Sequence, residues 1–320
     1  MGLLSGMARR LRGPGAPMRL IAGALCAALA LGGPAVAQER TKLGYGRIIN
    51  NDVFFDLRDR WQTTSFQSSR VYGPAWTGTL PETPGALLEF RLTGAMVAPA
   101  SLADPDPADR PWAGYLGAGL HTHYQARGYE VSLGADLIVT GPQLGLMDLQ
   151  RGVHDVINAP QPSAAVEAGQ IGNGTYPTLV VEMGRPLPLG EGVTLRPFVQ
   201  GRWGLETLAR AGFDMTIGPA GTGELLVRDA VTGQRYPSIK RDQPRPSFIM
   251  GADLAHVGHS VLLPESRGLE LTDARLRVRS GVHWQSRWGR FFYGLTWLGR
   301  EFEAQPEGQI VGSLRLDLDF

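Results

Sequence analysis

The 320-residue sequence has little charge, a single cysteine and few long apolar runs. Charged residues make up 19% of the chain, below the roughly 25% of an average soluble domain, and its 43 glycines are about twice the usual share. This composition argues against a helical enzyme or a coiled coil. The 7 Trp, 8 Tyr and 11 Phe can bury a large area, which argues against disorder. A net charge of +1 gives no indication of a nucleic-acid surface.

Several motifs of common enzymes are also missing from the sequence. There is no G-x-S-x-G elbow, no H-E-x-x-H metal motif, no P-loop and no cysteine nucleophile motif. No stretch after residue 37 has 18 consecutive apolar residues, so the sequence predicts no membrane-spanning helix there. What remains is an all-β protein whose apolar residues need not form one core.

Residues 1–37 have the features of an export signal. Four arginines precede an apolar run at 21–31, and Ala35-Val36-Ala37 is a small-x-small cleavage site. The run is too short for a membrane anchor. Cleavage after residue 37 would remove Cys26, the one cysteine, so the mature chain would have no disulfide. It would also leave 27 basic and 30 acidic residues, a net charge of −3. We therefore expect a signal peptide at 1–37 and one domain at 38–320.

The rest of the chain alternates between apolar and polar residues in segments of about ten. The clearest segments are 88–96, 129–139, 193–203, 274–283 and 313–320. Alternation with this length is typical of tilted strands that cross a bilayer. A soluble β-sandwich or a lipocalin-like barrel would also alternate, with the apolar side turned inward.

Three features favour a transmembrane barrel. Arg275, Arg277 and Arg279 form a charged row that suits a polar barrel interior better than a small dry core. The chain stops on Phe320, and a terminal aromatic residue on an alternating strand is similar to the recognition signal of bacterial outer-membrane barrels. Aromatic residues also lie near strand ends, as in an interfacial girdle, at Trp112, Trp203, Trp284, Trp288, Tyr293 and Trp297.

The fold class predicted is therefore an all-β, antiparallel transmembrane β-barrel of about twelve strands, an even number as expected for a single-chain bacterial barrel. The eighth strand is the weakest and falls at 212–218 or 223–230. The other strands are expected near 43–50, 62–72, 86–97, 112–125, 128–140, 176–185, 193–206, 246–257, 273–285, 290–301 and 310–320.

One segment breaks the period of two. Leu146, Leu149, Val153 and Val156 have helical spacing, and Asn158-Ala159-Pro160 ends the pattern, which predicts a short amphipathic loop helix. Gln150 and His154 are four residues apart and share a face of that helix. Either His154 is a general base with Gln150 beside it, or both are solvated surface residues.

Three further groups have both a functional and a structural interpretation. Residues 50–52, with Asp56, Asp59 and Arg60, offer amide and carboxylate oxygens that suit calcium, but Asn and Asp are also common in turns. Arg110, within residues 109–114, is expected to fix a loop by a salt bridge rather than bind phosphate. His121 and His123 share a strand face and are expected to be barrel-wall residues.

Taken in order, these segments resemble the outer-membrane lipid A 3′-O-deacylase family. The resemblance begins with Asn51-Asp52 in IINNDVFF and continues with Asp59-Arg60-x-x-Thr63. The segments DRPWAG at 109–114, the helix Q-x-x-x-H at 150–154 and REFEAQ at 300–305 follow. These pieces cover nearly the whole mature chain, and their order is far more specific than any one of them.

The resemblance implies a twelve-stranded outer-membrane barrel with its active site at the outer rim, beneath a loop helix. Asn51 and Asp52 would help to hold Ca²⁺, which would polarise the ester carbonyl of lipid A. His154 would deprotonate the attacking water, and Gln150 and Thr63 would position water, metal or substrate. The chain would then be a calcium-dependent carboxylic ester hydrolase of lipopolysaccharide, located in the cell outer membrane.

Two rival functions have features in their favour. The chain departs from the family pattern at 62–65 and after Pro160, which fits a catalytically inactive barrel with a structural or binding role. The charged interior rows would also suit a small-solute channel, although twelve strands enclose a narrow lumen that side chains usually fill.

Overall fold

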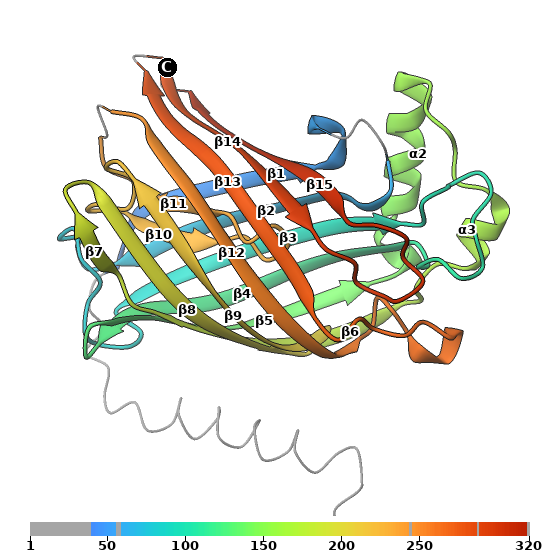
Figure 1. The fold of residues 1–320 in the computed structure, drawn as a ribbon, viewed down its shortest axis with the longest axis horizontal. Helices are drawn as coiled ribbons and strands as arrows, with labels where there is room; N and C mark the ends of the chain where they lie inside the picture. Colours follow the sequence, from blue (N-terminus) through green and yellow to red (C-terminus); the bar gives the residue numbers. More distant parts are fainter. Residues whose placement is uncertain (1–39, 56–58, 243–244, 287, 319–320) are drawn as a thin grey trace, which may run out of the picture. The chain divides into compact units, whose positions relative to one another are not determined.

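The computed structural model describes residues 40–55, 59–242, 245–286 and 288–318. The expected signal peptide at 1–37 and the terminal Phe320 lie outside the described residues. Within them, the chain forms one antiparallel β-barrel with short helices at one end (Figure 1).

Twelve strands close the barrel, as the alternation predicts. Neighbouring strands pair in the order β6-β5-β4-β3-β2-β1-β15-β14-β13-β12-β9-β8, and β8 pairs back to β6. A short strand, β7, extends β8 as a hairpin. The bounds are β1 (Thr41–Asn51), β2 (Trp61–Gly73), β3 (Leu87–Ala98), β4 (Ala113–Ala126), β5 (Tyr129–Thr140), β6 (Gly174–Gly184), β7 (Leu187–Gly190), β8 (Val193–Trp203), β9 (Glu206–Ile217), β12 (Ser247–Ser260), β13 (Arg275–Ser286), β14 (Gly289–Leu298) and β15 (Gln309–Leu318).

The eighth barrel strand shows where the sequence left a choice. It is β9 (Glu206–Ile217), which covers the first alternative, 212–218, up to residue 217, while the second alternative, 223–230, contains β10 (Leu225–Arg228). The predicted seventh strand ran to residue 206, but the chain turns after Trp203. Gly204 makes that turn possible, since its φ is +149° and a Cβ there would lie 2.5 Å from the Pro177 carbonyl oxygen.

The two faces of the barrel wall differ in chemistry as the transmembrane interpretation requires. Outward side chains such as Phe90, Leu137 and Leu254 are about half exposed, whereas Arg277 and Arg279 are buried in the lumen. An apolar outer face and a polar interior are typical of barrels that cross a bilayer. The predicted girdle residues that are exposed are Trp203, Trp284, Trp288, Tyr293 and Trp297.

Trp112 is the exception among the predicted girdle residues. Only 2% of its surface is exposed, because it packs with Leu102, Met147 and Val166 under the loops of the barrel end. The prediction that it belongs to the girdle was wrong, since the loop helix covers the place where it meets the wall.

A hairpin between β9 and β12 folds into the lumen. It consists of β10 (Leu225–Arg228) and β11 (Arg235–Ile239), and β11 runs along the inner face of β1. The approach is close enough to need glycine on the wall: a Cβ at Gly46 would lie 2.5 Å from the Pro237 carbonyl oxygen. Apolar contacts of the hairpin include Val227 and Tyr236, which join a buried cluster with Ile48 and Phe292.

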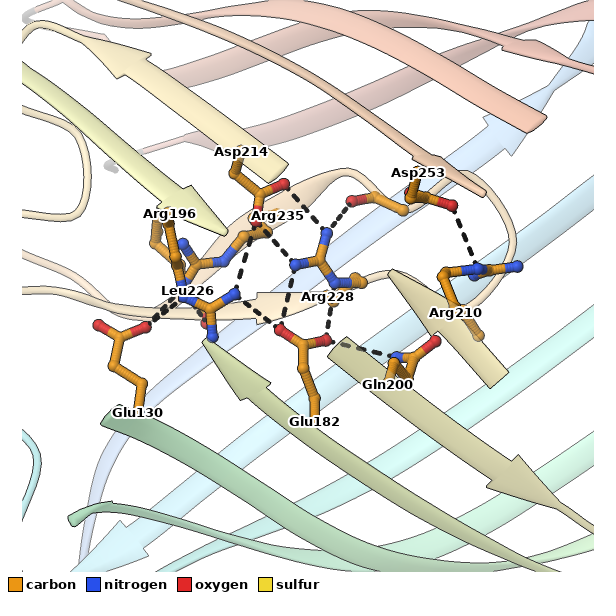
Figure 2. A network of polar contacts seen from close by, with 12 residues as sticks. Glu130, Glu182, Arg196, Gln200, Arg210, Asp214, Leu226, Arg228, Arg235 and Asp253 are labelled. Atoms are coloured by element: carbon orange, nitrogen blue, oxygen red, sulfur yellow. Dashed lines mark hydrogen bonds and ion pairs between the residues drawn. The ribbon is translucent and has the colours of Figure 1, made fainter. Parts of the chain in front are cut away.

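Ion pairs connect the hairpin to the opposite wall (Figure 2). Arg228 lies between Glu182 of β6 and Asp214 of β9, with contacts of 2.7 Å to each carboxylate. Asp253 of β12 accepts hydrogen bonds from Arg277 and Arg279. Because charges buried in this way are paired, the hairpin is a fixed part of the lumen.

The helices lie at the end of the barrel where β1 and β2 are connected, which we call the helix end (Figure 1). The predicted loop helix is α2, which begins after a left-handed Gly145 and ends at a left-handed Asn158. No helix among the described residues is long and apolar enough to cross a membrane. The helical bounds are η1 (Asp52–Phe54), η2 (Pro142–Leu144), α2 (Leu146–Ile157), α3 (Ala164–Ala168) and η3 (Glu265–Arg267).

The barrel closes where its first and last strands meet. The pairs described between β1 and β15 are Ile49 with Leu314, Asn50 with Ser313 and Asn51 with Gly312. This seam therefore ends at the helix end of the barrel, directly before η1.

Candidate functional site

Asn51 and Asp52 form the turn that leaves β1. The Asn51 side chain caps η1 by accepting a hydrogen bond from the Val53 amide at 2.7 Å. Asp52 is fully buried, and its Oδ2 accepts from the Arg60 amide at 2.9 Å, while its Oδ1 has no hydrogen-bond partner. Burial raises the pKa of Asp52 to about 8, opposed by the Arg60 N–H and helped by the nearby Asp59 carboxylate.

The residue before this turn is held by three elements. Asn50 is fully buried, and its Nδ2 donates to Ser65 of β2 at 2.9 Å and to Asp229 at the hairpin tip at 3.1 Å. Its Oδ1 accepts from Ser313 of β15 at 2.7 Å and from Thr232 at 3.5 Å. The tip of the lumen hairpin therefore reaches the strand end that carries Asn51 and Asp52.

Gln150 and His154 are buried although they belong to a loop helix. Both lie on the face of α2 that is turned toward the barrel, and their exposures are 2% and 5%. The Gln150 Oε1 accepts from the indole Nε1 of Trp112 at 2.7 Å, and its Nε2 donates to Asp59 Oδ2 at 3.0 Å. The interpretation of both side chains as solvated surface residues is therefore excluded.

His154 contacts acceptors at both ring nitrogens. Nδ1 lies 2.6 Å from the carbonyl oxygen of Pro160, which can only accept, so Nδ1 carries a proton. Nε2 lies 2.8 Å from Asp59 Oδ2. In the neutral imidazole, Nε2 is the basic nitrogen, and it points at Asp59.

Thr63 lies on β2 where the pairing with β3 is irregular. The register shifts between Gln62 and Thr64, so Thr63 is the extra residue of a bulge. Its hydroxyl is buried and has no hydrogen-bond partner. Just before it, Trp61 has a φ of +50°, and the Arg60 guanidinium lies over its ring at 4.4 Å. The start of β2 thus departs from regular strand geometry both at Trp61 and at Thr63.

The residues at this end offer oxygen donors of the kind that calcium prefers. Unpartnered buried oxygens are Asp52 Oδ1, Asp59 Oδ1 and Thr63 Oγ1. Carboxylate and hydroxyl oxygens without nitrogen or sulfur donors fit a hard cation. The described residues contain no group of three or more His, Cys, Asp or Glu side chains placed to hold a metal ion. The fit therefore rests on two carboxylates supplemented by neutral oxygens, and one of these, on Asn51, already caps η1.

The five residues predicted from the sequence are thus distributed over four elements, β1, η1, β2 and α2, near one end of the barrel. Gln150 and His154 come together through Asp59, while Asp52 is linked to the same segment through the Arg60 amide. Sequence analysis placed Asp59 in a cluster that could suit calcium and in the Asp-Arg-x-x-Thr motif, but it did not predict the contacts of Asp59 with Gln150 and His154. It assigned no site role to Pro160, whose carbonyl oxygen follows the C-terminus of α2, and it placed Trp112 in the girdle. The contact of Trp112 with Gln150 joins residues that are far apart in the sequence, so no local pattern predicts it.

Other predictions concern residues outside this site. Arg110 forms an ion pair with Glu301, within REFEAQ, as expected for a residue that fixes a loop. His121 and His123 face the lumen and contact Asp136 and Glu89 at 2.9 Å and 2.7 Å. They are barrel-wall residues, as predicted.

Comparison with known proteins identifies a family and a solved structure with a similar fold. The profile of the family described as outer membrane protein LpxR matches residues 22–320. Among solved structures, LpxR from Salmonella typhimurium is similar with a TM-score of 0.69 and 16% sequence identity, over 87% of this chain and all of that chain. No curated protein matches the sequence significantly.

Two other solved barrels are more distant. The β domain of the Bordetella autotransporter BrkA has a TM-score of 0.38 at 10% identity, over 87% of this chain and 99% of that one. The Pseudomonas putida toluene transporter TodX has a TM-score of 0.32 at 10% identity, over 89% of this chain and 81% of that one.

Proposed function

The chain belongs to the outer membrane protein LpxR family, the lipid A 3′-O-deacylases that the ordered motifs resemble, and from this premise we propose that it is a calcium-dependent ester hydrolase of lipid A. The reaction would release the 3′-linked acyloxyacyl chain in the outer leaflet. The observation that carries the proposal is the Asp59–His154–Gln150 group, in which His154 and Gln150 are buried, together with the unpartnered buried oxygens of Asp52, Asp59 and Thr63 at the same end of the barrel.

In the proposed reaction, His154 is the general base. The Pro160 carbonyl fixes the ring by accepting from Nδ1, so Nε2 is the nitrogen that takes the proton. Asp59 contacts Nε2 in the described state, so this contact must be exchanged for the attacking water before the reaction. The Asp59 carboxylate then stabilises the imidazolium that forms.

Hydrolysis follows from this arrangement in two steps. Water loses a proton to His154 Nε2 while its oxygen attacks the ester carbonyl carbon, which gives a tetrahedral oxyanion. The carbon–oxygen bond to the sugar then breaks, and His154 returns the proton to the sugar oxygen. The products are a free acid and a sugar hydroxyl, and no covalent intermediate is needed.

The other predicted residues have supporting roles. Gln150 holds Asp59 through its Nε2 and is itself held by Trp112, so it keeps the carboxylate in place. Asp52, with Asn51 and the Thr63 hydroxyl nearby in the chain, would hold calcium. When bound there, calcium polarises the ester carbonyl and stabilises the developing oxyanion.

Mass spectrometry of lipid A tests the proposal directly. Cells with and without the protein are compared, and membranes of the expressing cells are incubated with calcium or with a chelator. We expect a loss of mass equal to one acyloxyacyl group, only with protein and calcium. An unchanged acyl pattern, with protein that runs as a folded barrel in unheated gels, would contradict the enzymatic function and favour an inactive barrel.

A further inference from the structure

The loop helix α2 turns an apolar stripe away from the barrel. Leu149, Val153 and Val156 follow a spacing of four and three, so they lie on one face, and they are 49–85% exposed. The neighbouring face holds the buried Gln150 and His154. The catalytic side chains and the apolar stripe therefore lie on adjoining faces of the same helix.

The remaining face of α2 is charged. Arg151 pairs with Glu167 of α3 at 2.7 Å, and Asp155 accepts from Gln161 at 2.7 Å. The segment after the helix thus packs along the charged side and leaves the apolar stripe uncovered. A helix with separate apolar and charged faces of this kind is typical of segments that lie in a membrane interface.

A second apolar patch lies on the connection between β1 and β2. Val53, Phe54 and Phe55 follow Asp52 and are 39–49% exposed. The patch rests on the outer wall: the Tyr293 hydroxyl donates to the Phe54 carbonyl oxygen at 3.1 Å, and a Cβ at Gly312 would lie 2.5 Å from the Phe54 Cβ. It therefore continues the lipid-facing surface of β14 and β15.

We infer that these two patches, residues 53–55 and the stripe Leu149–Val153–Val156, are immersed together in the acyl chains of the surrounding outer leaflet. We call them the lipid-facing lip. Residues 53–55 are continuous with the apolar outer wall, and Asp59, four residues beyond Phe55, hydrogen-bonds to α2. Helix α2 also stands crosswise to the strands (Figure 1), the orientation of a helix that lies along a membrane surface.

The lip has a consequence for substrate entry, and this part rests on the proposed function. His154 is on the face of α2 that adjoins the stripe, and Asp52 directly precedes residues 53–55. An acyl ester already in the leaflet would approach them sideways through hydrocarbon, with its chains in contact with the lip. The lip would then contact both the lipids that surround the barrel and the lipid A molecule that reacts.

Site-specific quenching tests the immersion without any measurement of activity. The variants Val156→Cys and Asp148→Cys place one fluorophore on the apolar and the charged face of α2, with Cys26 replaced by serine. The full barrel is reconstituted into phosphatidylcholine vesicles that contain nitroxide-labelled acyl chains. We expect several-fold stronger nitroxide quenching at position 156 than at 148, and stronger quenching by aqueous iodide at 148.

Two results would overturn the inference. Equal iodide quenching at both positions, with weak nitroxide quenching at 156, would place the stripe in water. Disulfide cross-linking between Val156→Cys chains at high yield, with protection from both quenchers, would assign the stripe to a second copy of this chain.

A paired activity measurement then separates the lip from the proposed function. Val153→Asp should slow deacylation of lipid in intact membranes several-fold more than deacylation of lipid dispersed in detergent, and Asp148→Asn should affect neither. If the chain has no deacylase activity, the quenching result still decides whether the lip is immersed. If activity is present, equal loss in membranes and detergent would contradict lateral entry.

Discussion

The lumen and the helix end bury the same kinds of side chain but leave them in different states. In the lumen, Asp253 and Glu182 are each surrounded by arginines, and both of their carboxylate oxygens are bonded. At the helix end, Asp52 and Asp59 each keep one buried oxygen without a partner among the described residues. Paired charges stabilise a structure, whereas unpaired oxygens are available to a ligand. The difference agrees with the proposed function, in which the lumen network supports the barrel and the helix end has oxygens left for a ligand.

The strongest test of this comparison is the removal of the proposed base. His154→Ala should lower the deacylation rate by about 10²–10⁴-fold, the usual contribution of a general base, with the barrel still folded. Rates are measured by mass spectrometry of lipid A and folding by heat-modifiable gel mobility. His256→Ala on β12, where the side chain is exposed, is the matched control and should keep full activity. A similar loss in both variants would remove the distinction between the two regions.

The second test removes a paired carboxylate from the lumen, where we expect a loss of stability rather than of activity. Asp253→Ala leaves Arg210, Arg277 and Arg279 without their shared carboxylate and should lower the free energy of unfolding by about 3–5 kcal/mol. Activity per folded molecule should stay unchanged. Urea titration in detergent measures the stability. An unfolding midpoint equal to that of the wild type would show that the network does not support the barrel.

Asp59 combines both states, because its Oδ2 contacts Gln150 and His154 while its buried Oδ1 has no hydrogen-bond partner. Asp59→Asn keeps the size of the side chain but loses the charge that faces His154, and we expect a loss of about 10–100-fold in rate. The binding of substrate should change less than the rate, so the kcat should fall more than the KM rises. Unchanged kinetics would show that the Asp59 contact has only a structural role.

The smallest effect is expected where the two regions meet. Asp229 at the hairpin tip accepts from Asn50 and from both donors of Thr232. Asp229→Ala should cost about 1–3 kcal/mol of stability, because buried donors lose their acceptor. If the hairpin tip also keeps the turn that carries Asn51 and Asp52 in place, this variant should need a higher calcium concentration for half-maximal activity. A stability loss without any change in calcium dependence would limit Asp229 to support of the lumen.

Most of the barrel could be predicted from the sequence because period-two alternation is a local pattern. The strands near 86–97 and 128–140 agree with β3 and β5 within one residue, and the spacing of Leu146 to Val156 located α2. The lumen hairpin could not be predicted, because its ion pairs join Arg228 to residues on β6 and β9. In the sequence alone, the alternation in these short strands cannot be distinguished from that of a weak strand of the barrel wall.

The candidate site divides in the same way. The ordered motifs pointed to Asp52, Thr63, Gln150 and His154, but spacing alone did not show that the polar face of α2 is buried. The contact between Asp59 and His154 depends on how the β1–β2 connection and α2 fold back on the barrel, and no local pattern encodes it. The roles of these residues stay predictions until the variants are measured.

The position of the seam has a consequence for biogenesis. The first and last strands meet at Asn50 and Ser313, directly before the turn that carries Asp52. β1 and β15 are the first and last strands of the described chain, so their pairing joins residues far apart in the sequence and closes the wall. The oxygens of the turn therefore reach their final places only when the wall has closed. If the proposed function is correct, closure of the wall and completion of the site would be the same event.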